Sequence, residues 1–205
     1  MIKLIIFDLW STLEYKRHKK GTVEWIYEKL ARKHSLRKVR KTFEKTFHMH
    51  KSDSFEKDYK KMFDILQIKH DHIIIKKNAL YRRKIESESS LYKYSVPLLR
   101  TLNKKRYKVA LLSNITHFHG ILIKKSILKK YIDKFFFSYE LGSIKPDKKN
   151  FRAVLSYFKV KPSETIMIGD NYKDDIVPSK ELGINAIHFR NGKKLKRKLK
   201  KIGVL

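Results

Sequence analysis

The chain begins with a short apolar run and then changes its hydrophobic spacing. Ile2 to Phe7 are mostly apolar, which predicts a buried strand that ends at Asp8. From about Gly21 to Ser90, apolar side chains recur at the spacing of an amphipathic helix. Examples are Val23, Ile26, Tyr27, Leu30, Phe43, Phe47, Tyr59 and Phe63. This second segment is therefore predicted to form several antiparallel helices.

After Pro97, which suits the first turn of a helix, strand-like and helix-like segments alternate. The expected strands are Val109–Leu112, Phe135–Phe137, Thr165–Ile168 and Ile184–Phe189, and the expected helices are Ile121–Leu128, Phe151–Phe158 and Asp175–Leu182. This alternation predicts an α/β fold, a doubly wound parallel sheet that includes the N-terminal strand. We expect residues 1–14 and 95–205 to form the core domain, and residues 15–94 to form a small helical-bundle domain inserted into it.

Polar side chains follow several of the predicted strands. Asp8, Ser113, Lys145 and Asp170 all come at or soon after a strand end. Each one alone has an ordinary explanation, since an Asp after a strand commonly forms a turn or caps a helix. In an open parallel sheet, however, ligands bind beyond the carboxyl ends of the strands. Together these residues therefore predict a functional site at that edge.

Four segments stand in a fixed order along the chain. They are FDLWSTL around Asp8, LLSN at Ser113 and Asn114, IKPD at Lys145, and IGDNYKDD from Asp170 to Asp175. These segments resemble the four motifs of the haloacid dehalogenase superfamily of hydrolases. The resemblance implies a Rossmann-like core, a cap domain formed by the inserted helices, and catalytic roles for Asp8 and Lys145. In that role Asp8 is the nucleophile that becomes covalently bonded to the substrate.

The chemistry of such a nucleophile demands positive charge and hydrogen-bond donors. A carboxylate that attacks a phosphate ester approaches a centre that is itself anionic. Lys145 offers an ammonium group, while Ser113 and Asn114 offer neutral donors to the oxygens of the transferring group. Trp10, in the loop after the nucleophile, is a further residue expected to contact the substrate. We therefore expect a small anionic substrate, with a phosphorylated one favoured.

Two further acids near Asp8 predict a metal. Carboxylates gathered within about 4 to 6 Å of one another are unfavourable unless they are neutralised. Mg²⁺ is bound by oxygen ligands and retains several waters, so it suits such a site. The family resemblance implies that Asp8, Asp170, Asp175 and the main-chain carbonyl of Trp10 hold it. The spacing alone also permits Asp174 as the second acid, and the family pattern favours Asp175.

Trp10 stands where superfamily phosphatases usually carry a second Asp that acts as general acid and base. Members that cleave carbon–halogen bonds carry an aromatic residue there. Loss of a general acid costs about 10²- to 10⁴-fold, whereas phosphatases accelerate hydrolysis by up to ~10²¹-fold. A phosphatase can therefore survive the loss, and the paired acids have no role in metal-free dehalogenation. We favour a Mg²⁺-dependent phosphatase; a 2-haloacid dehalogenase and a catalytically degenerate basic scaffold are the alternatives.

Two histidines and a basic C-terminal segment are less informative. His117 and His119 follow the second motif and are candidates for proton transfer, because histidine titrates near neutral pH. Histidines on such a helix also commonly face solvent or cap it. The basic segment from Lys193 to Lys201 predicts a helix with Leu195, Leu199 and Ile202 on one side, a pattern typical of a terminal helix that packs on the sheet and also of nucleic-acid or membrane-surface binders.

Composition limits the remaining choices. The 205 residues include 50 Lys and Arg against 20 Asp and Glu, a net charge of +30, and no cysteine. Absence of cysteine excludes disulfides and thiolate chemistry, and the N-terminus lacks a signal-peptide pattern, so we expect a cytoplasmic protein without a membrane span. The charge permits nucleic-acid binding but does not favour it, since no nucleic-acid motif is present. The oligomeric state is left open.

Overall fold

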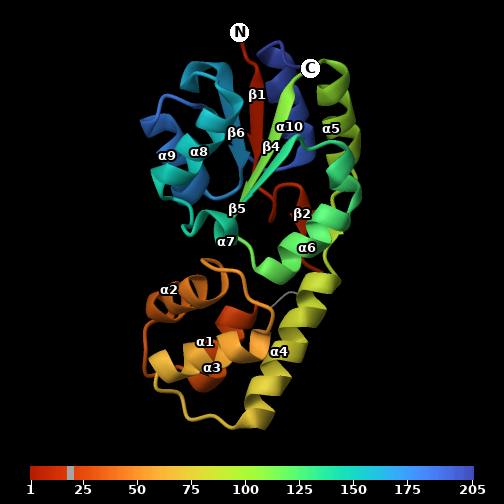
Figure 1. The fold of residues 1–205 in the computed structure, drawn as a ribbon. Helices are drawn as coiled ribbons and strands as arrows, with labels where there is room; N and C mark the ends of the chain where they lie inside the picture. The colour runs from red at the N-terminus through yellow and green to blue at the C-terminus, as the bar shows by residue number, and fades with distance from the viewer. Residues whose placement is uncertain (18–20) are drawn as a thin grey trace.

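The computed structural model describes residues 1–17 and 21–205, which form two units, one above the other in Figure 1. The larger unit contains a five-stranded parallel sheet with strand order β5-β4-β1-β6-β7. Its strands are β1 (Leu4–Phe7), β4 (Lys108–Ser113), β5 (Lys134–Phe137), β6 (Thr165–Gly169) and β7 (Asn185–His188). The predicted doubly wound α/β sheet is confirmed, with the N-terminal strand in the middle of the sheet.

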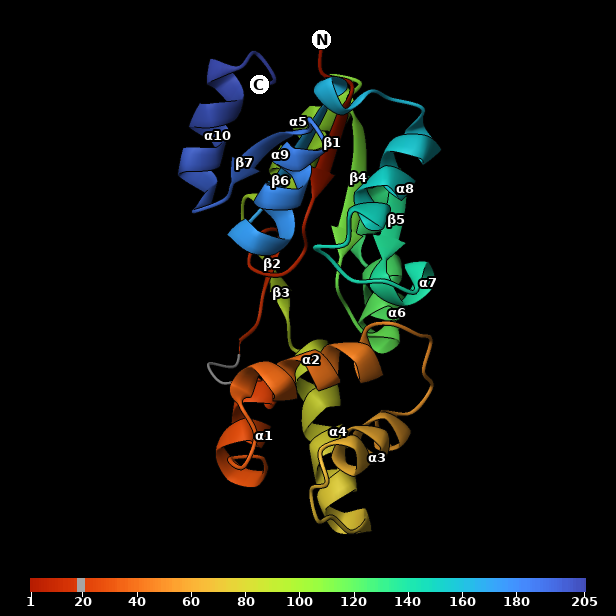
Figure 2. The same cartoon turned by 90° about the vertical axis from the view of Figure 1, so that its left-hand side faces the viewer.

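Helices cover both faces of this sheet (Figures 1 and 2). On one face lie α5 (Ser95–Lys104), α6 (His117–Lys125) and α10 (Gly192–Lys201), and on the other α8 (Lys148–Phe158) and α9 (Val177–Glu181). In β1, Ile5 and Phe7 pack with the first group, whereas Leu4 and Ile6 pack with α8. Because successive side chains of a strand point to opposite faces, a wholly apolar strand fits between two helical layers.

Short helical elements complete the larger unit. These elements are η1 (Ile127–Lys130), α7 (Ser138–Leu141), η2 (Pro162–Glu164) and η3 (Tyr172–Ile176). Three of the predicted helices begin earlier than expected, and one of them is α8, which begins at Lys148 rather than Phe151. The helix expected from Ile121 begins at His117 instead, because Thr116 Oγ1 accepts a hydrogen bond from the main-chain N–H of His119. The helix expected from Asp175 begins with η3 at Tyr172, a π-helical turn that leads into α9.

The smaller unit is a bundle of α1 (Thr22–Leu30), α2 (Leu36–Phe47), α3 (Phe55–Ile65) and α4 (His72–Ser87). Ser35, Ser54 and Asp71 cap α2, α3 and α4, since each side chain accepts a hydrogen bond from the third residue after it. The apolar faces of the four helices form a hydrophobic cluster of their own that includes Tyr59 and Phe63. The helical character predicted for this segment is confirmed.

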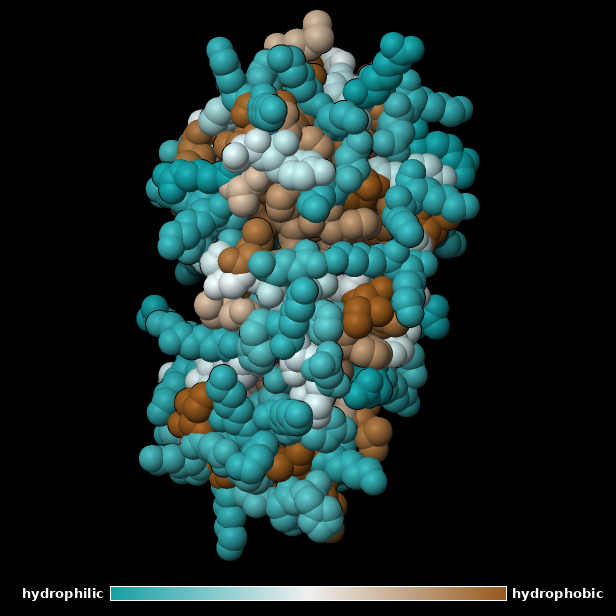
Figure 3. Space-filling view, in the orientation of Figure 1, coloured by the Kyte–Doolittle hydropathy of each residue, from teal (hydrophilic) through white to brown (hydrophobic). Residues whose placement is uncertain are grey.

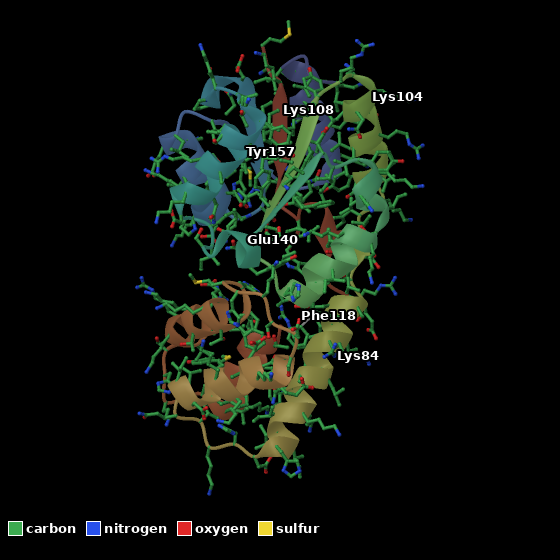
Figure 4. All side chains as sticks on the ribbon, in the orientation of Figure 1. Lys84, Lys104, Lys108, Phe118, Glu140 and Tyr157 are labelled. Atoms are coloured by element: carbon green, nitrogen blue, oxygen red, sulfur yellow. The ribbon has the colours of Figure 1, made fainter. Side chains whose placement is uncertain are left out.

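Two chain crossings and a side-chain contact join the units. β2 (Glu14–Tyr15) and β3 (Ser90–Leu91) pair as an antiparallel ribbon where the chain leaves and re-enters the larger unit. Figure 4 shows Phe118 of α6 at the junction, and its ring lies 5.5 Å from that of Phe55. Nearby, Thr116 Oγ1 donates to Glu86 Oε2 over 2.6 Å. Buried polar and aromatic contacts thus set the bundle against the end of α6.

Hydrophilic side chains cover much of both units on the face shown in Figure 3, with hydrophobic residues showing between them. In the basic helix α10, Leu195 and Leu199 are buried in the core cluster. This helix therefore packs against the sheet, as the more ordinary of the two interpretations predicts. None of the helices that the structure describes is long and apolar enough to cross a membrane.

Candidate active site

The polar side chains predicted to lie together converge at the carboxyl ends of three adjacent strands. β1 lies between β4 and β6, with Phe7 in register with Leu111 and Ile168. Asp8 directly follows β1, Ser113 is the last residue of β4, and Asp170 directly follows β6. The order of the strands therefore brings together residues more than a hundred positions apart. Asp8 lies in the centre of this group and is almost fully buried.

Lys145 forms the strongest contacts within the site. Its Nζ lies 2.7 Å from Asp8 Oδ1 and 2.6 Å from Asp175 Oδ1, and all three side chains are buried. Burial disfavours the Lys145 ammonium, but the charges of Asp175 and Asp8 outweigh this effect and raise its pKa. Lys145 therefore stays charged between the two carboxylates, and it fixes one oxygen of each.

Asn114 holds Lys145 in place from the neighbouring strand end. Its Nδ2 donates to the main-chain carbonyl of Lys145 over 3.0 Å, and its Oδ1 accepts from the Lys145 main-chain N–H over 2.8 Å. We predicted Asn114 as a donor to the substrate, but its amide is engaged with the Lys145 main chain. The structure thus gives Asn114 a positioning contact that the sequence did not suggest.

The carboxylates of Asp8, Asp170 and Asp175 form a potential metal site. One oxygen from each lies within 4.8 Å of the others. Asp175 is fixed from the opposite side, where its Oδ2 accepts a hydrogen bond from the Asn171 N–H over 3.1 Å. Gly169 is required for this packing because a Cβ there would overlap Asp175 Oδ2. A set of hard carboxylate oxygens with a partly exposed member, Asp170, fits Mg²⁺ rather than a softer metal.

Burial and mutual repulsion alter the titration of these acids. Desolvation, opposed by the nearby Lys145 charge and assisted by Asp175 and Asp170, raises the pKa of Asp8 to about 7. Desolvation and the Asp175 charge likewise raise the pKa of Asp170. The single ammonium of Lys145 is thus insufficient to neutralise three carboxylates. Additional positive charge at this position would favour their ionised forms.

Asp174 lies at the edge of this cluster. Its Oδ2 accepts a hydrogen bond from Asn171 Nδ2 over 2.6 Å. Asp175, in contrast, contacts Lys145 directly, and it lies near Asp8 and Asp170. Of the two acids that the spacing permitted, the structure brings Asp175 into the cluster.

Ser113 provides an unsatisfied donor at the end of the strand that neighbours β1 and Asp8. Its side chain is buried at the end of β4, and its Oγ has no hydrogen-bond partner among the described residues. Buried hydroxyls without partners are uncommon because they lose their hydrogen bonds to water. A substrate oxygen beside Asp8 would satisfy this group, and the contact between Ser113 and the transferring group stays a prediction.

Trp10, at the position where family phosphatases usually carry a second acid, packs against a buried polar network. Its indole stacks on the His119 imidazole, with ring centroids 4.4 Å apart. His119 Nε2 in turn lies 2.8 Å from Glu14 Oε2, whose other oxygen accepts from Ser89 Oγ. The contact between Glu14 and His119 joins residues 105 positions apart, and no local pattern in the sequence indicated it.

His117, the other histidine considered for proton transfer, contacts the helical unit. Its Nδ1 lies 2.9 Å from the main-chain oxygen of Ser52. Its ring also packs edge-on against Tyr139, with centroids 5.1 Å apart. His117 therefore forms part of the junction between the two units.

Comparison with known proteins identifies the class. A model of the haloacid dehalogenase-like hydrolase family matches residues 2–183, so the chain belongs to this family of hydrolases. Over 100 residues the chain is also 36% identical to a glyceraldehyde 3-phosphate phosphatase of Pyrococcus furiosus. The aligned region makes up 47% of this chain and 40% of that relative.

Solved structures share the fold over nearly the whole chain. A magnesium and inorganic phosphate complex of a family enzyme from Bacteroides thetaiotaomicron has a TM-score of 0.64 and 19% identity, and it covers 94% of this chain and 96% of its own. A phosphatase of the family from Thermococcus onnurineus has a TM-score of 0.62 and 19% identity, with 98% of each chain covered. The 2-haloacid dehalogenase of Pseudomonas syringae pv. Tomato has a TM-score of 0.60 and 20% identity, covering 92% and 86%. At these identities the likeness extends to the fold alone.

Proposed function

We propose that this hydrolase is a Mg²⁺-dependent phosphatase that acts on a small phosphorylated metabolite through an aspartyl-phosphate intermediate at Asp8. The observation that carries the proposal is the approach of three carboxylates, from Asp8, Asp170 and Asp175, to within 4.8 Å. A covalent mechanism needs only one carboxylate as the nucleophile, and the ion pair of that carboxylate with Lys145 needs no further acid. The two further acids are best explained as oxygen ligands of a divalent cation. The partial similarity to a phosphatase agrees with this interpretation.

The residues of the chain would share the chemistry as follows. Asp8 attacks the phosphorus atom, the bond from phosphorus to the ester oxygen breaks, and the leaving oxygen takes up a proton from water to give the alcohol. Lys145 orients the Asp8 carboxylate, and Ser113 donates a hydrogen bond to an oxygen of the phosphoryl group. Water then hydrolyses the acyl phosphate, which releases phosphate and restores Asp8.

The metal would be held by Asp8, Asp170, Asp175 and the main-chain carbonyl of Trp10. When bound, it would supply positive charge to the phosphoryl oxygens. Trp10 provides no side-chain proton for the leaving group, so esters with good leaving groups are expected to react fastest.

The helical unit would serve as the cap over this site. Arg40 and Glu44 of α2 lie near Asp174. Burial and the charge of Asp174 raise the pKa of Glu44, and the charge of Arg40 opposes the rise that burial causes in the pKa of Asp174. A cleft of about 190 Å³ lies between the units and is lined by Trp10 and Asn114 of the core together with residues of α1 and α2. A substrate bound at Asp8 would extend its leaving group into this cleft.

A second candidate function is 2-haloacid dehalogenation, and Trp10 is the observation that favours it. An aromatic residue suffices after the nucleophile when the leaving group is a halide, because a halide needs no proton. In that reaction Asp8 would form an ester with carbon, and water would then hydrolyse the ester. The acids Asp170 and Asp175 have no part in it and argue for the phosphatase.

The decisive experiment measures both reactions on the same preparation. Hydrolysis of p-nitrophenyl phosphate is followed with Mg²⁺ and with chelator, and halide release from 2-chloropropionate is followed in parallel. We expect Mg²⁺-dependent phosphate release that Asp8→Asn abolishes. The control is Asp64→Asn, which changes an exposed acid of α3 far from the cluster. Metal-independent halide release would replace the phosphatase with the dehalogenase, and inactivity in both assays would favour the basic scaffold.

A further inference from the structure

The loop that follows Asp8 has a densely hydrogen-bonded main chain with one carbonyl left over. The Leu9 carbonyl accepts hydrogen bonds from three later N–H groups of the loop, and the Glu14 carbonyl accepts one from Ser11 over 2.7 Å. The Trp10 carbonyl, which lies between these two in the chain, accepts no hydrogen bond from the residues that the structure describes. Its lone pairs are therefore available to water or to a cation.

The peptide that carries this carbonyl is part of a strained turn. The ψ angle of Trp10 and the φ angle of Ser11 together set the direction of the carbonyl. Ser11 has a φ of 59°, in the left-handed region that residues with a side chain disfavour. Such a conformation persists only where the surrounding contacts hold it. The direction of the Trp10 carbonyl therefore depends on what fixes Trp10 and its neighbours.

The Trp10 side chain is fixed by a buried pair of polar residues. Its indole stacks on the His119 imidazole, with ring centroids 4.4 Å apart and 26° between the ring planes. His119 Nε2 lies 2.8 Å from Glu14 Oε2, and Ser89 Oγ donates to Glu14 Oε1 over 2.7 Å. Glu14 and His119 are both buried. A hydrogen bond that ends on the Trp10 loop itself thus fixes the plane on which the indole stacks.

His119 is anchored to the core independently of this loop. Figure 1 shows α6, which carries His119, at the end of the larger unit that faces the helical bundle. Thr116 caps this helix, and its Oγ1 accepts a hydrogen bond from the His119 main-chain N–H over 3.1 Å. The same hydroxyl donates to Glu86 Oε2 over 2.6 Å. His119 therefore provides a fixed surface against which the Trp10 loop is held.

Stability alone does not explain a buried polar pair at this place. Replacement of a buried ion pair by apolar side chains of similar volume is often neutral or stabilising, because burial removes the hydration of both groups. His119 Nδ1 adds to the cost, since it is buried and has no hydrogen-bond partner among the described residues. An apolar pair would fill the space but would not fix the plane of a ring. The orientation given to Trp10 is what distinguishes the pair that is present.

We propose that Glu14 and His119 are positioning residues for Trp10, and that they hold its main-chain carbonyl in place for the divalent cation. This inference rests on the proposed Mg²⁺-dependent phosphatase function, in which three carboxylates supply the other protein ligands. Glu14 and His119 themselves contact neither substrate nor metal in this role. Residues that support a metal ligand commonly alter metal affinity by about 10- to 100-fold when they are replaced.

The test replaces the pair with apolar side chains. Glu14→Leu/His119→Leu removes the hydrogen bond and the stacked ring without leaving a buried charge unpaired, so the urea midpoint should not fall. The dissociation constant for Mg²⁺, measured by calorimetric titration without substrate, should rise by about 10- to 100-fold. His119→Gln keeps a donor to Glu14 but has no ring to stack on Trp10. It should show the same loss of affinity, and it keeps the test open if the double variant does not fold.

Two matched controls separate positioning from charge and from general stability. Glu14→Gln removes the charge, but its amide oxygen can still accept from His119 Nε2, so Mg²⁺ affinity should stay close to that of the unmodified protein. Glu164→Leu removes an ion-paired glutamate directly before β6, at the opposite end of that strand from Asp170. It should also leave Mg²⁺ affinity unchanged.

The fluorescence of Trp10 reports its position without metal or turnover. The chain has two tryptophans, so Trp25→Phe leaves Trp10 as the only one. In this background, acrylamide quenching of the Trp10 emission should increase in Glu14→Leu/His119→Leu and in His119→Gln. Quenching should be unchanged in Glu14→Gln.

The possible results distinguish this role from the phosphatase. Mg²⁺ affinity that is unchanged in Glu14→Leu/His119→Leu or in His119→Gln would overturn the positioning role and leave the phosphatase intact. A loss of affinity without a change in quenching would also overturn it, since the pair would then not act through Trp10. If the unmodified protein neither binds Mg²⁺ nor hydrolyses p-nitrophenyl phosphate, the proposed function fails, and the positioning role fails with it.

Discussion

Asn114 forms two hydrogen bonds with the main chain of Lys145, 31 positions later in the sequence: it donates to the carbonyl and accepts from the N–H. Lys145 belongs to a loop, so its ammonium would otherwise be free to move away from Asp8. The amide of Asn114 extends from the end of β4, one of the most buried strands of the sheet. The rigidity of the sheet is thereby transmitted to the Lys145 side chain in its loop.

Asn114→Ala should therefore reduce turnover more than substrate affinity. The substitution leaves the Lys145 N–H and carbonyl without partners, which costs about 1 to 3 kcal/mol of stability. Misplacement of Lys145 should lower kcat by about 10- to 100-fold with a smaller change in KM. Steady-state kinetics with p-nitrophenyl phosphate and urea unfolding measure the two effects. A change in KM alone would instead indicate that Asn114 contacts the substrate.

Lys145→Met should destabilise the protein strongly. It leaves the buried carboxylates of Asp8 and Asp175 without their cation, and removal of one partner of a buried ion pair costs about 3 to 5 kcal/mol. The double variant Lys145→Met/Asp175→Asn should recover part of this loss because one of the two charges is removed with the lysine. Urea unfolding in chelator measures the free energies. Equal stability of the single and double variants would contradict strong coupling between Lys145 and Asp175.

The sequence predicted the sheet and the gathering of acids because both follow from local patterns. Each core strand is a run of apolar residues, and the chemistry lies at the ends of those runs. Parallel pairing then brings Asp8, Ser113 and Asp170 to one edge. Contacts between distant segments, such as that of Glu14 with His119, could not be predicted from the sequence. These depend on how the loops pack once the sheet exists.

Capping residues explain why two of the helices begin earlier than predicted. Thr116 and Asn171 cap the helices that begin at His117 and Tyr172, and both are residue types that favour the N-cap position. An apolar pattern identifies only the turns of a helix that face the core, so the first turn of each helix was missed. Greater weight on capping residues would have placed both starts correctly.

His48 should make stability depend on pH. Burial, followed by the charges of Arg82 and Lys16, holds the pKa of His48 well below its ordinary value of 6.5. The unfolded chain therefore binds a proton that the folded protein does not, and stability falls as the pH drops below about 6.5. Above that pH the contribution is fully present.

The change that tests this is His48→Gln, which removes the titrating group. Urea unfolding at pH 5 and pH 7.5 should show a smaller difference in stability for His48→Gln than for the unmodified protein. The control is His72→Gln, at an exposed position in the first turn of α4, which should keep the full difference. Equal pH dependence in all three proteins would show that acid destabilisation arises elsewhere.

Trp10→Asp should change which esters the enzyme hydrolyses well. The new carboxylate stands two residues after Asp8, the proposed nucleophile, and can protonate the leaving ester oxygen, an effect typically of about 10²- to 10⁴-fold. Alkyl phosphates have poor leaving groups and should gain most, whereas p-nitrophenyl phosphate needs little protonation and should gain least. The ratio of kcat/KM for glycerol 3-phosphate to that for p-nitrophenyl phosphate should therefore rise. Trp10→Phe, which keeps an aromatic ring against His119, should leave the ratio unchanged. If the ratio stays constant in Trp10→Asp while circular dichroism shows an intact fold, the absence of an acid at this position does not limit the reaction, and another group of the site delivers the proton.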